Sequence, residues 1–255
     1  MEKLMEISHV GYSYHTMEGE TPALVNINFT VHKGEFLSIV GPSGCGKSTL
    51  LSLLSGLLEP EHGSIRLYGQ KLFQKGSETI GYMLQHDHLF EWRTIEKNVL
   101  LGLEIQNRLT PEAKEKVLDM LKLYGLYKFK DAKPSQLSGG MRQRAALIRT
   151  LALEPELLLL DEPFSALDYQ TRLTVGDDIG SIIKKEQKTA ILVTHDLAEA
   201  VSLGNQVLIL SKRPGTVKTI VPITFSDCLT PLERRNAPEF KDYFNMIWKE
   251  LNMDD

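Results

Sequence analysis

The sequence predicts an α/β protein with a mostly parallel sheet, and two observations support this. A glycine-rich segment, residues 41–48, follows an apolar run typical of a buried strand, residues 36–40. Apolar residues at helical spacing then follow, namely Leu50, Leu53, Leu54 and Leu57. Downstream, the four consecutive leucines at 157–160 cannot alternate between a buried and an exposed face. They therefore indicate a strand buried on both faces, as in the centre of a parallel sheet.

The composition is that of an ordinary folded protein. Of its residues, 42% are hydrophobic and 24% are charged. The length of 255 residues is enough for one large domain or two small ones. A formal net charge of -4 does not favour nucleic acid as a partner. One of the two cysteines, Cys45 and Cys228, lies in the glycine-rich segment, so we expect a reducing compartment and no disulfide framework. No apolar stretch is long enough to predict a membrane span or a signal peptide, so we expect a cytosolic protein.

Several strands are predicted before and after the glycine-rich segment. Residues 4–14 predict a first strand that ends in the aromatic residues Tyr12 and Tyr14. Residues 25–31 alternate apolar and polar side chains, which predicts a half-buried strand. Another short strand is expected to begin at Ile65 and Leu67, and residues 80–84 predict one that stops at Gln85.

The glycine-rich segment fits the pattern G-x-x-x-x-G-K-[ST] of a phosphate-binding loop. Glycines allow backbone amides to curl around phosphate oxygens, and the following helix turns its free amides towards the same anion. We expect Lys47 to reach the β- and γ-phosphates and the Ser48 hydroxyl to hold Mg²⁺. The alternative is a glycine-rich turn that matches the pattern by accident.

Residues 86–155 predict a helical subdomain inserted between strands. Thr110 and Pro111 suit an N-cap and a first helical position, and Gly125 suits the residue after a helix end. The apolar stripe between them consists of Val117, Leu118, Leu121 and Tyr124. Ser138 is a second predicted N-cap, before a helix that runs towards residues 154–155. Taken alone, this stretch is typical of a capped surface helix.

Polar residues end two neighbouring predicted strands. Asp161 and Glu162 follow the four leucines, at the edge where α/β sheets hold ligands. Asp161 is placed to bind Mg²⁺, and Glu162 to orient or deprotonate a water molecule. An exposed structural pair of acids is the alternative. His195 follows the predicted strand at 190–193, and both a catalytic role and a surface or packing role are open for it. Asp196 and Glu199 predict a capping box at the start of the next helix.

The remaining segments complete the predicted fold. Residues 165–168 predict a turn before a helix, and residues 207–210 predict a further strand before a turn at Pro214 and Gly215. Beyond about residue 225 the chain is polar and ends in an amphipathic stretch formed by Phe240, Phe244, Ile247 and Leu251.

Together these segments resemble the ATPase subunit of ATP-binding-cassette (ABC) transporters over nearly the whole chain. The motifs occur in family order: Walker A at 41–48, Gln85, the Leu-Ser-Gly-Gly signature at 137–140, Walker B through Asp161 and Glu162, the loop at 165–168, and His195. The resemblance implies a P-loop NTPase-type core with a mostly parallel sheet, an N-terminal antiparallel β-region and an inserted α-helical subdomain. The implied ATPase domain spans 1–225, with its core at 1–85 and 156–225, its helical subdomain at 86–155, and a short tail at 226–255.

The resemblance also implies a mechanism in which two copies face head to tail with two ATP molecules between them. Lys47, Gln85, Glu162 and His195 would be catalytic, with Gln85 sensing Mg²⁺ and the attacking water and His195 steadying the γ-phosphate. The Mg²⁺ ligands would be Ser48, Gln85 and Asp161. Tyr14 would stack on adenine, with Tyr12 as the alternative. The full set of expected ATP contacts is Tyr14, Gly41, Pro42, Ser43, Gly44, Cys45, Gly46, Lys47, Ser48 and Thr49, with Ser138, Gly139 and Gly140 of the other copy at the γ-phosphate.

Residues 86–103 resemble the segment with which this family meets its membrane permease, and local packing of the helical subdomain is the alternative. The segment is similar to that of nitrate, sulfonate and taurine importers, although Glu91 replaces their proline. The resemblance implies a subunit on the cytoplasmic face of the membrane that powers uptake of a small anion delivered by an extracytoplasmic binding protein. A non-transport ATPase of DNA repair or ribosomes is disfavoured because no coiled-coil insertion or second cassette is present. A catalytically silent binding module is disfavoured by the intact Lys47, Glu162 and His195.

Overall fold

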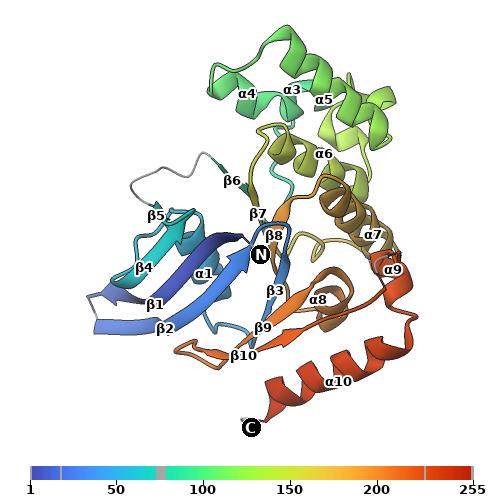
Figure 1. The fold of residues 1–255 in the computed structure, drawn as a ribbon. Helices are drawn as coiled ribbons and strands as arrows, with labels where there is room; N and C mark the ends of the chain where they lie inside the picture. The colour runs from blue at the N-terminus through green and yellow to red at the C-terminus, as the bar shows by residue number, and fades with distance from the viewer. Residues whose placement is uncertain (1, 18, 73–78, 227, 254–255) are drawn as a thin grey trace.

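The computed structural model describes residues 2–17, 19–72, 79–226 and 228–253. Two β-sheets and a group of helices make up these residues, with the helices of residues 95–151 standing above the sheets in Figure 1. The predicted tail at 226–255 includes residues 227, 254 and 255, which lie outside the described residues. None of the described helices has the length and apolar character needed to span a bilayer.

The larger sheet has six strands in the order β10-β9-β3-β8-β7-β6. All neighbouring pairs are parallel except β10 with β9, which confirms the predicted mostly parallel sheet. The leucines at 157–160 lie in β7, between β8 and β6, and are completely buried as predicted. The strands are β3 (Phe36–Val40), β6 (Ile80–Met83), β7 (Leu157–Asp161), β8 (Thr189–Val193), β9 (Gln206–Leu210) and β10 (Val217–Pro222).

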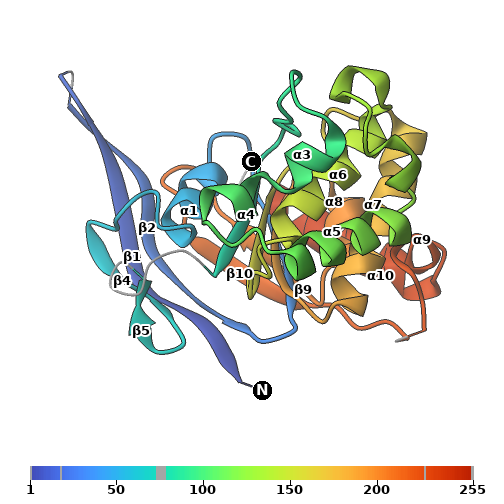
Figure 2. The same ribbon diagram turned by 90° about the horizontal axis from the view of Figure 1, so that it is seen from above.

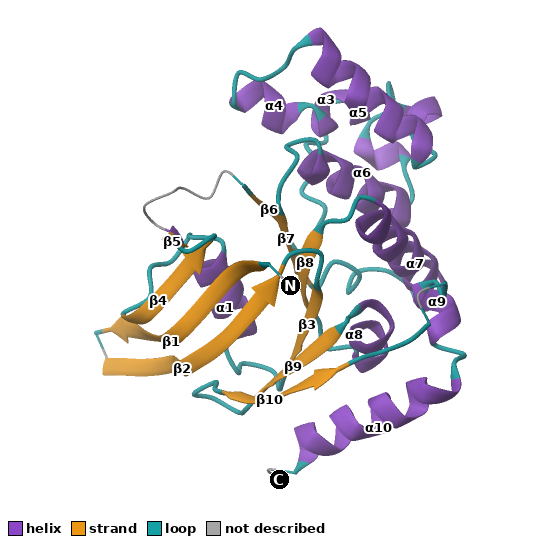
Figure 3. Ribbon diagram, viewed as in Figure 1, coloured by secondary structure: helices purple, strands orange, loops and turns teal. Residues whose placement is uncertain are grey.

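The smaller sheet is the N-terminal antiparallel region that the family resemblance implied (Figure 3). It contains β1 (Lys3–Thr16), β2 (Gly19–His32), β4 (His62–Leu67) and β5 (Gln70–Lys71). The alternation predicted for residues 25–31 is wrong at Val25, which is 43% exposed. Asn26 has a φ of 50°, and the β1–β2 register shifts around it, so Leu24 rather than Val25 faces the core. Ile65 and Leu67 lie at the end of β4, not at its beginning.

Helix α1 (Lys47–Leu54) packs between the two sheets, and its leucines join an apolar core with side chains of β1, β2 and β7. The helix is shorter than the leucine spacing predicted. It ends before Leu57, which is 70% exposed in the turn that follows. Gly56 has a φ of 76°, a left-handed conformation that terminates helices.

The helical region contains α3 (Ile95–Val99), α4 (Leu101–Ile105), α5 (Pro111–Leu123) and α6 (Gly139–Leu151). Both predicted N-caps are confirmed, since Thr110 Oγ1 accepts from the amide of Ala113 and Ser138 Oγ from that of Met141. Gly125 follows the end of α5 with a φ of 73°. One apolar core joins these helices to the sheet and to α7 (Tyr169–Lys185), so the division into core and helical subdomain remains a prediction.

The C-terminal part contains α8 (Leu197–Leu203), α9 (Pro231–Arg234) and α10 (Pro238–Asn252). Helix α10 lies against α8 and β9, with Ile247 fully buried, so the predicted amphipathic stretch is confirmed (Figure 2). The predicted capping box is wrong in one half. Asp196 Oδ1 accepts from the amides of Ala198 and Glu199. The Glu199 side chain instead turns into the core, where it accepts from Thr194 Oγ1 at 2.6 Å.

Candidate active site

The predicted functional loops meet because their strands are neighbours in the larger sheet. Strand β8 pairs with β3 on one side and with β7 on the other, all in parallel. The carboxyl ends of the three strands therefore share one edge. The glycine-rich loop follows β3, Glu162 follows β7, and His195 lies just beyond β8.

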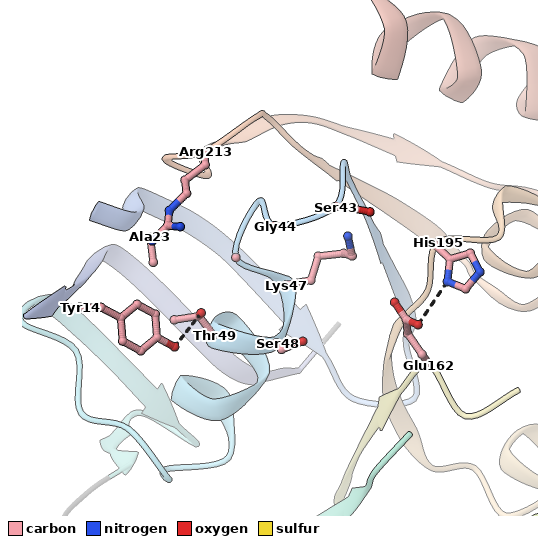
Figure 4. Close-up of a pocket in the computed structure, with 11 residues that line it drawn as sticks. Tyr14, Ala23, Ser43, Gly44, Lys47, Ser48, Thr49, Glu162, His195 and Arg213 are labelled. Atoms are coloured by element: carbon pink, nitrogen blue, oxygen red, sulfur yellow. Dashed lines mark hydrogen bonds and ion pairs between the residues drawn. The ribbon is translucent and has the colours of Figure 1, made fainter. Parts of the chain in front are cut away.

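A cavity of about 540 Å³ lies at this edge, as Figure 4 shows. Most of its wall comes from the glycine-rich loop and the start of α1, and Glu162 and His195 close the opposite side. Figure 4 shows the Lys47 side chain extending towards the side of the cavity that holds Glu162 and His195. The complete lining is Tyr14, Ala23, Ser43, Gly44, Gly46, Lys47, Ser48, Thr49, Glu162, His195 and Arg213.

Glycine is required in the loop at two positions. Gly44 and Gly46 have φ values of 76° and 105°, which residues with a Cβ rarely adopt. At Gly46 a Cβ would also lie 2.7 Å from the Leu24 side chain. Gly46 is the N-cap of α1 and has no side chain that could cap the helix. The N–H groups in the first turn of α1 therefore remain able to donate to a bound anion.

Lys47 is held in place before any anion arrives. Its side chain is buried, and its Nζ donates to the carbonyl oxygens of Gly41 at 2.7 Å and Pro42 at 3.0 Å. These bonds fold the ammonium back over the loop. An entering phosphate replaces neutral acceptors with charged ones, which form stronger hydrogen bonds.

Three of the four predicted catalytic residues contact one another. Glu162 Oε2 lies 3.2 Å from His195 Nδ1 and accepts from Gln85 Nε2 at 3.5 Å. Gln85 Nε2 also donates to Ser165 Oγ at 3.2 Å. Glu162 has a φ of 43°, and its amide donates to the carbonyl of Val193 in the neighbouring strand. Strained backbone of this kind is concentrated at functional sites, where the surroundings impose it.

Asp161 lies one residue earlier, at the end of β7. Burial raises the pKa of its carboxyl group above the usual value, while the hydroxyl of Tyr82, donating to Oδ2 at 3.2 Å, opposes this shift. Lys47 attracts the same carboxylate. With the Ser48 hydroxyl and the Gln85 amide oxygen, Asp161 offers the oxygen donors that Mg²⁺ prefers. Neither Asp161 nor Gln85 lines the cavity itself.

The structure does not bring Ser138, Gly139 and Gly140 to this cavity. They lie at the start of α6, where Ser138 is exposed, and none of them is among the lining residues. A γ-phosphate contact from these residues therefore requires a second copy of the chain. Of the two tyrosines, Tyr14 lines the cavity and its hydroxyl lies 3.0 Å from Thr49 Oγ1, whereas Tyr12 packs against the core.

Ala23 and Arg213 line the cavity without having been predicted there. Arg213 Nε donates to the carbonyl of Pro22 at 3.1 Å, and Gly215 pairs with Leu24. These contacts bring the Arg-Pro-Gly turn beside β2. The turn is visible in the sequence, but its position at the cavity depends on pairing between residues far apart in the chain.

Comparison with known proteins agrees with the motifs. A family model described as ABC transporter matches residues 24–165. An uncharacterized ABC transporter ATP-binding protein of Bacillus subtilis, YtlC, is 47% identical, with 97% of this chain and 95% of the relative covered. The nitrate import ATP-binding protein NrtD of Synechocystis is 40% identical over 95% of this chain and 93% of its own. The aliphatic sulfonates import ATP-binding protein SsuB of Bacillus subtilis is 41% identical, with 89% and 86% covered.

The fold is also similar to a solved cassette. The dimeric post-hydrolysis structure of the ATP-binding cassette MJ0796, bound to ADP and Pi, superposes with a TM-score of 0.74. The match has 31% sequence identity and covers 87% of this chain and all of the other.

Proposed function

Because this chain belongs to the ABC transporter family, whose members are ATPases, we propose that it hydrolyses ATP to drive uptake of a small anion through separate permease subunits. The observation that carries the proposal is that Glu162 and His195 line a cavity walled by the phosphate loop, with Gln85 in contact with Glu162 behind them. ATP hydrolysis needs an anion cradle and a group that positions water, and this arrangement supplies both.

Each residue has a distinct task in the proposed mechanism. The loop amides and Lys47 hold the β- and γ-phosphates, and Tyr14 stacks on the adenine. Glu162 orients the attacking water and accepts its proton. His195 fixes the Glu162 carboxylate through Nδ1 and steadies the γ-phosphate. Mg²⁺, held by Ser48, Gln85 and Asp161, would neutralise charge on the phosphates.

We propose that a second copy completes the site. The similar cassette MJ0796 is dimeric, and a head-to-tail dimer would bring Ser138, Gly139 and Gly140 of the partner to the γ-phosphate. Closure of such a dimer on ATP and its opening after hydrolysis is a rigid-body motion that a permease can use.

The permease contact is proposed for residues 86–103. Phe90 and Trp92 stack at 4.6 Å between ring centroids, and Trp92 is 72% exposed. Glu91, which replaces the family's proline, accepts from the amide of Ser135 and so ties this segment to the helical region. An exposed aromatic pair on a tethered segment suits a partner helix. If this contact forms, it holds the subunit at the cytoplasmic face of the membrane, which is the location that we propose.

The proposed solute class rests on the relatives. NrtD and SsuB are named for nitrate and aliphatic sulfonates, both anions. We propose that a small anion of this kind is delivered to the permease by an extracytoplasmic binding protein. We also propose the division into a core at 1–85 and 156–225, a helical subdomain at 86–155 and a tail at 226–255.

The test is to purify tagged Glu162→Gln protein from its native host in mild detergent with ATP and Mg²⁺. This substitution keeps the side-chain shape but removes the base, so ATP-bound complexes accumulate. A multi-span permease should copurify, and Lys47→Ala, which lacks the phosphate-binding ammonium, is the matched control that should recover much less of it. A ribosomal or DNA-repair partner in place of a permease would refute the transport proposal.

A further inference from the structure

The active-site cavity contains an arginine that has no task in the proposed mechanism. Arg213 lines the cavity, and Figure 4 shows it on the other side of Ala23 from Tyr14. In the same view, Glu162 and His195 lie at the opposite end of the cavity. The γ-phosphate is assigned to that opposite end, and the adenine is assigned to Tyr14. Arg213 therefore lies where the nucleoside part of ATP would bind.

The turn that carries Arg213 is fastened to β2 by backbone hydrogen bonds. The amide of Gly215 donates to the carbonyl of Ala23 at 2.9 Å, and the amide of Val25 donates to the carbonyl of Gly215 at 2.9 Å. Because these bonds involve only backbone atoms, they do not depend on the side chain at position 213. A substitution of Arg213 should therefore leave the turn attached to β2.

The same turn also packs against the phosphate loop. Gly215 is buried, and a Cβ at this position would overlap the carbonyl oxygen of Cys45. Only glycine therefore allows the turn to approach the phosphate loop this closely. The position of Arg213 relative to the phosphate loop is set by the fold and does not depend on a bound nucleotide.

The Arg213 side chain is anchored at one atom and is otherwise available to a ligand. Its Nε donates to the carbonyl of Pro22 at 3.1 Å, on the residue before Ala23 in β2. Of the described residues, no other accepts a hydrogen bond from this guanidinium, and no carboxylate pairs with it. Its two Nη groups can therefore donate to a bound molecule. A guanidinium held in this way also keeps a defined plane, which suits a flat partner.

Tyr14 and Arg213 flank one space at the edge of β2. Tyr14 pairs with Thr21 in the β1–β2 register, next to Pro22, whose carbonyl holds Arg213, and both side chains line the cavity. Nucleobases stack on aromatic rings and on the planes of arginine guanidinium groups. We propose that Arg213 covers the face of the adenine opposite Tyr14, so that the base binds between a phenol ring and a guanidinium. This inference rests on the assignment of the cavity to ATP, and it adds a contact to the nucleoside and none to the phosphates.

The test compares a nucleotide with an anion that has no nucleoside. ADP and inorganic tripolyphosphate are titrated calorimetrically into the full chain with Mg²⁺, at about 0.3 M salt to screen long-range charge effects. Arg213→Gln should weaken ADP about fivefold or more, which is the loss expected when one base-stacking contact is removed. The same variant should weaken tripolyphosphate by less than about twofold, because the remaining effect of a distant charge is screened. An unchanged ADP affinity, or equal losses for ADP and tripolyphosphate, would refute the assignment.

Two further variants separate the shape of the guanidinium from its charge. Arg213→Lys keeps the charge but loses the flat group, so it should weaken ADP by about threefold and leave tripolyphosphate unchanged. Arg66 is exposed on β4 and does not line the cavity, so Arg66→Gln is the matched control. This control removes one positive charge and should bind both ligands as the unmodified chain does. An Arg213→Lys protein that binds ADP normally would show that only charge matters and would contradict the stacking contact.

A pyrimidine nucleotide shows whether the contact is with the base. UDP carries the same ribose and phosphates as ADP but a smaller ring, so Arg213→Gln should weaken UDP less than ADP. Equal losses for the two nucleotides would place the guanidinium on the ribose and overturn the adenine assignment. Failure of the ATP assignment itself would give a different result, because Lys47→Ala would then leave the affinities for both ADP and tripolyphosphate unchanged.

Discussion

The conformation of the phosphate loop predicts different consequences for two alanine substitutions. Gly44 and Gly46 both have positive φ values, so Ala at either position costs about 1–2 kcal/mol of backbone strain. Their surroundings differ. A Cβ on Gly44 would meet no atom within 4 Å, whereas one on Gly46 would lie 2.7 Å from Leu24 Cδ2 and 3.0 Å from the Ala23 carbonyl oxygen. Crowding of this kind costs a further ~1–3 kcal/mol.

We therefore expect Gly44→Ala to lower the free energy of unfolding by about 1–2 kcal/mol and Gly46→Ala by about 2–5 kcal/mol. Urea denaturation of the nucleotide-free protein, followed by circular dichroism, measures both changes as shifts in midpoint at constant slope. If the loop instead moves to relieve the contact with Leu24, the stability loss shrinks and ATP affinity falls. A Gly46→Ala protein that is no less stable than Gly44→Ala and binds ATP normally would refute the reasoning.

Four further changes have defined outcomes. Lys47→Ala should abolish tight ATP binding, and an unchanged dissociation constant in a fluorescent-nucleotide titration would contradict the phosphate-loop assignment. Ser138→Arg in a Glu162→Gln background should prevent ATP-dependent dimerisation on a sizing column. Ser138→Ala loses the helix cap, at about 1 kcal/mol, and the hydroxyl contact to the γ-phosphate, but it adds no bulk and keeps the Gly139 and Gly140 amides, so it should still dimerise. Burial raises the pKa of the Glu199 carboxyl above 4.5, so its contribution to folding is greatest below that value and is lost as pH rises through the raised pKa. The melting temperature of Glu199→Gln should accordingly rise relative to that of the unmodified chain as the pH is raised above about 4.5, and a difference that is constant with pH would contradict this. Arg172 donates from Nη2 to the Leu167 carbonyl at 3.3 Å, and we expect this bond to hold the 165–168 loop, whose Ser165 contacts Gln85. Arg172→Gln should therefore lower turnover severalfold without changing ATP affinity, and normal turnover would contradict this expectation.

Much of the candidate site was predictable because its signals are local. The phosphate loop is specified by glycines, a lysine and a serine within eight residues, whose allowed backbone angles and donors decide the conformation. The N-caps at Thr110 and Ser138 depend on an amide three residues away. The leucines of β7 could only be a doubly buried strand, which placed Asp161 and Glu162 at its carboxyl end.

Other features were decided by contacts between distant residues, which no local pattern encodes. Glu199 looked like a capping residue, but a buried partner on the preceding loop draws it into the core. Val25 continues an apolar alternation, yet the register of β1 against β2 turns it outwards. Arg213 reaches the cavity only because its turn pairs with Leu24.

The sequence by itself therefore determined the fold class, the order of the motifs and the type of chemistry, since these follow from backbone preferences and side-chain spacing within a few residues. Tertiary structure alone decided which side chains converge, from the pairing of Glu162 with His195 to the placement of Arg213 beside β2 at the cavity. The physical reason is that strand register and helix docking bring together residues as many as about 200 positions apart, and these depend on the packing of the whole core.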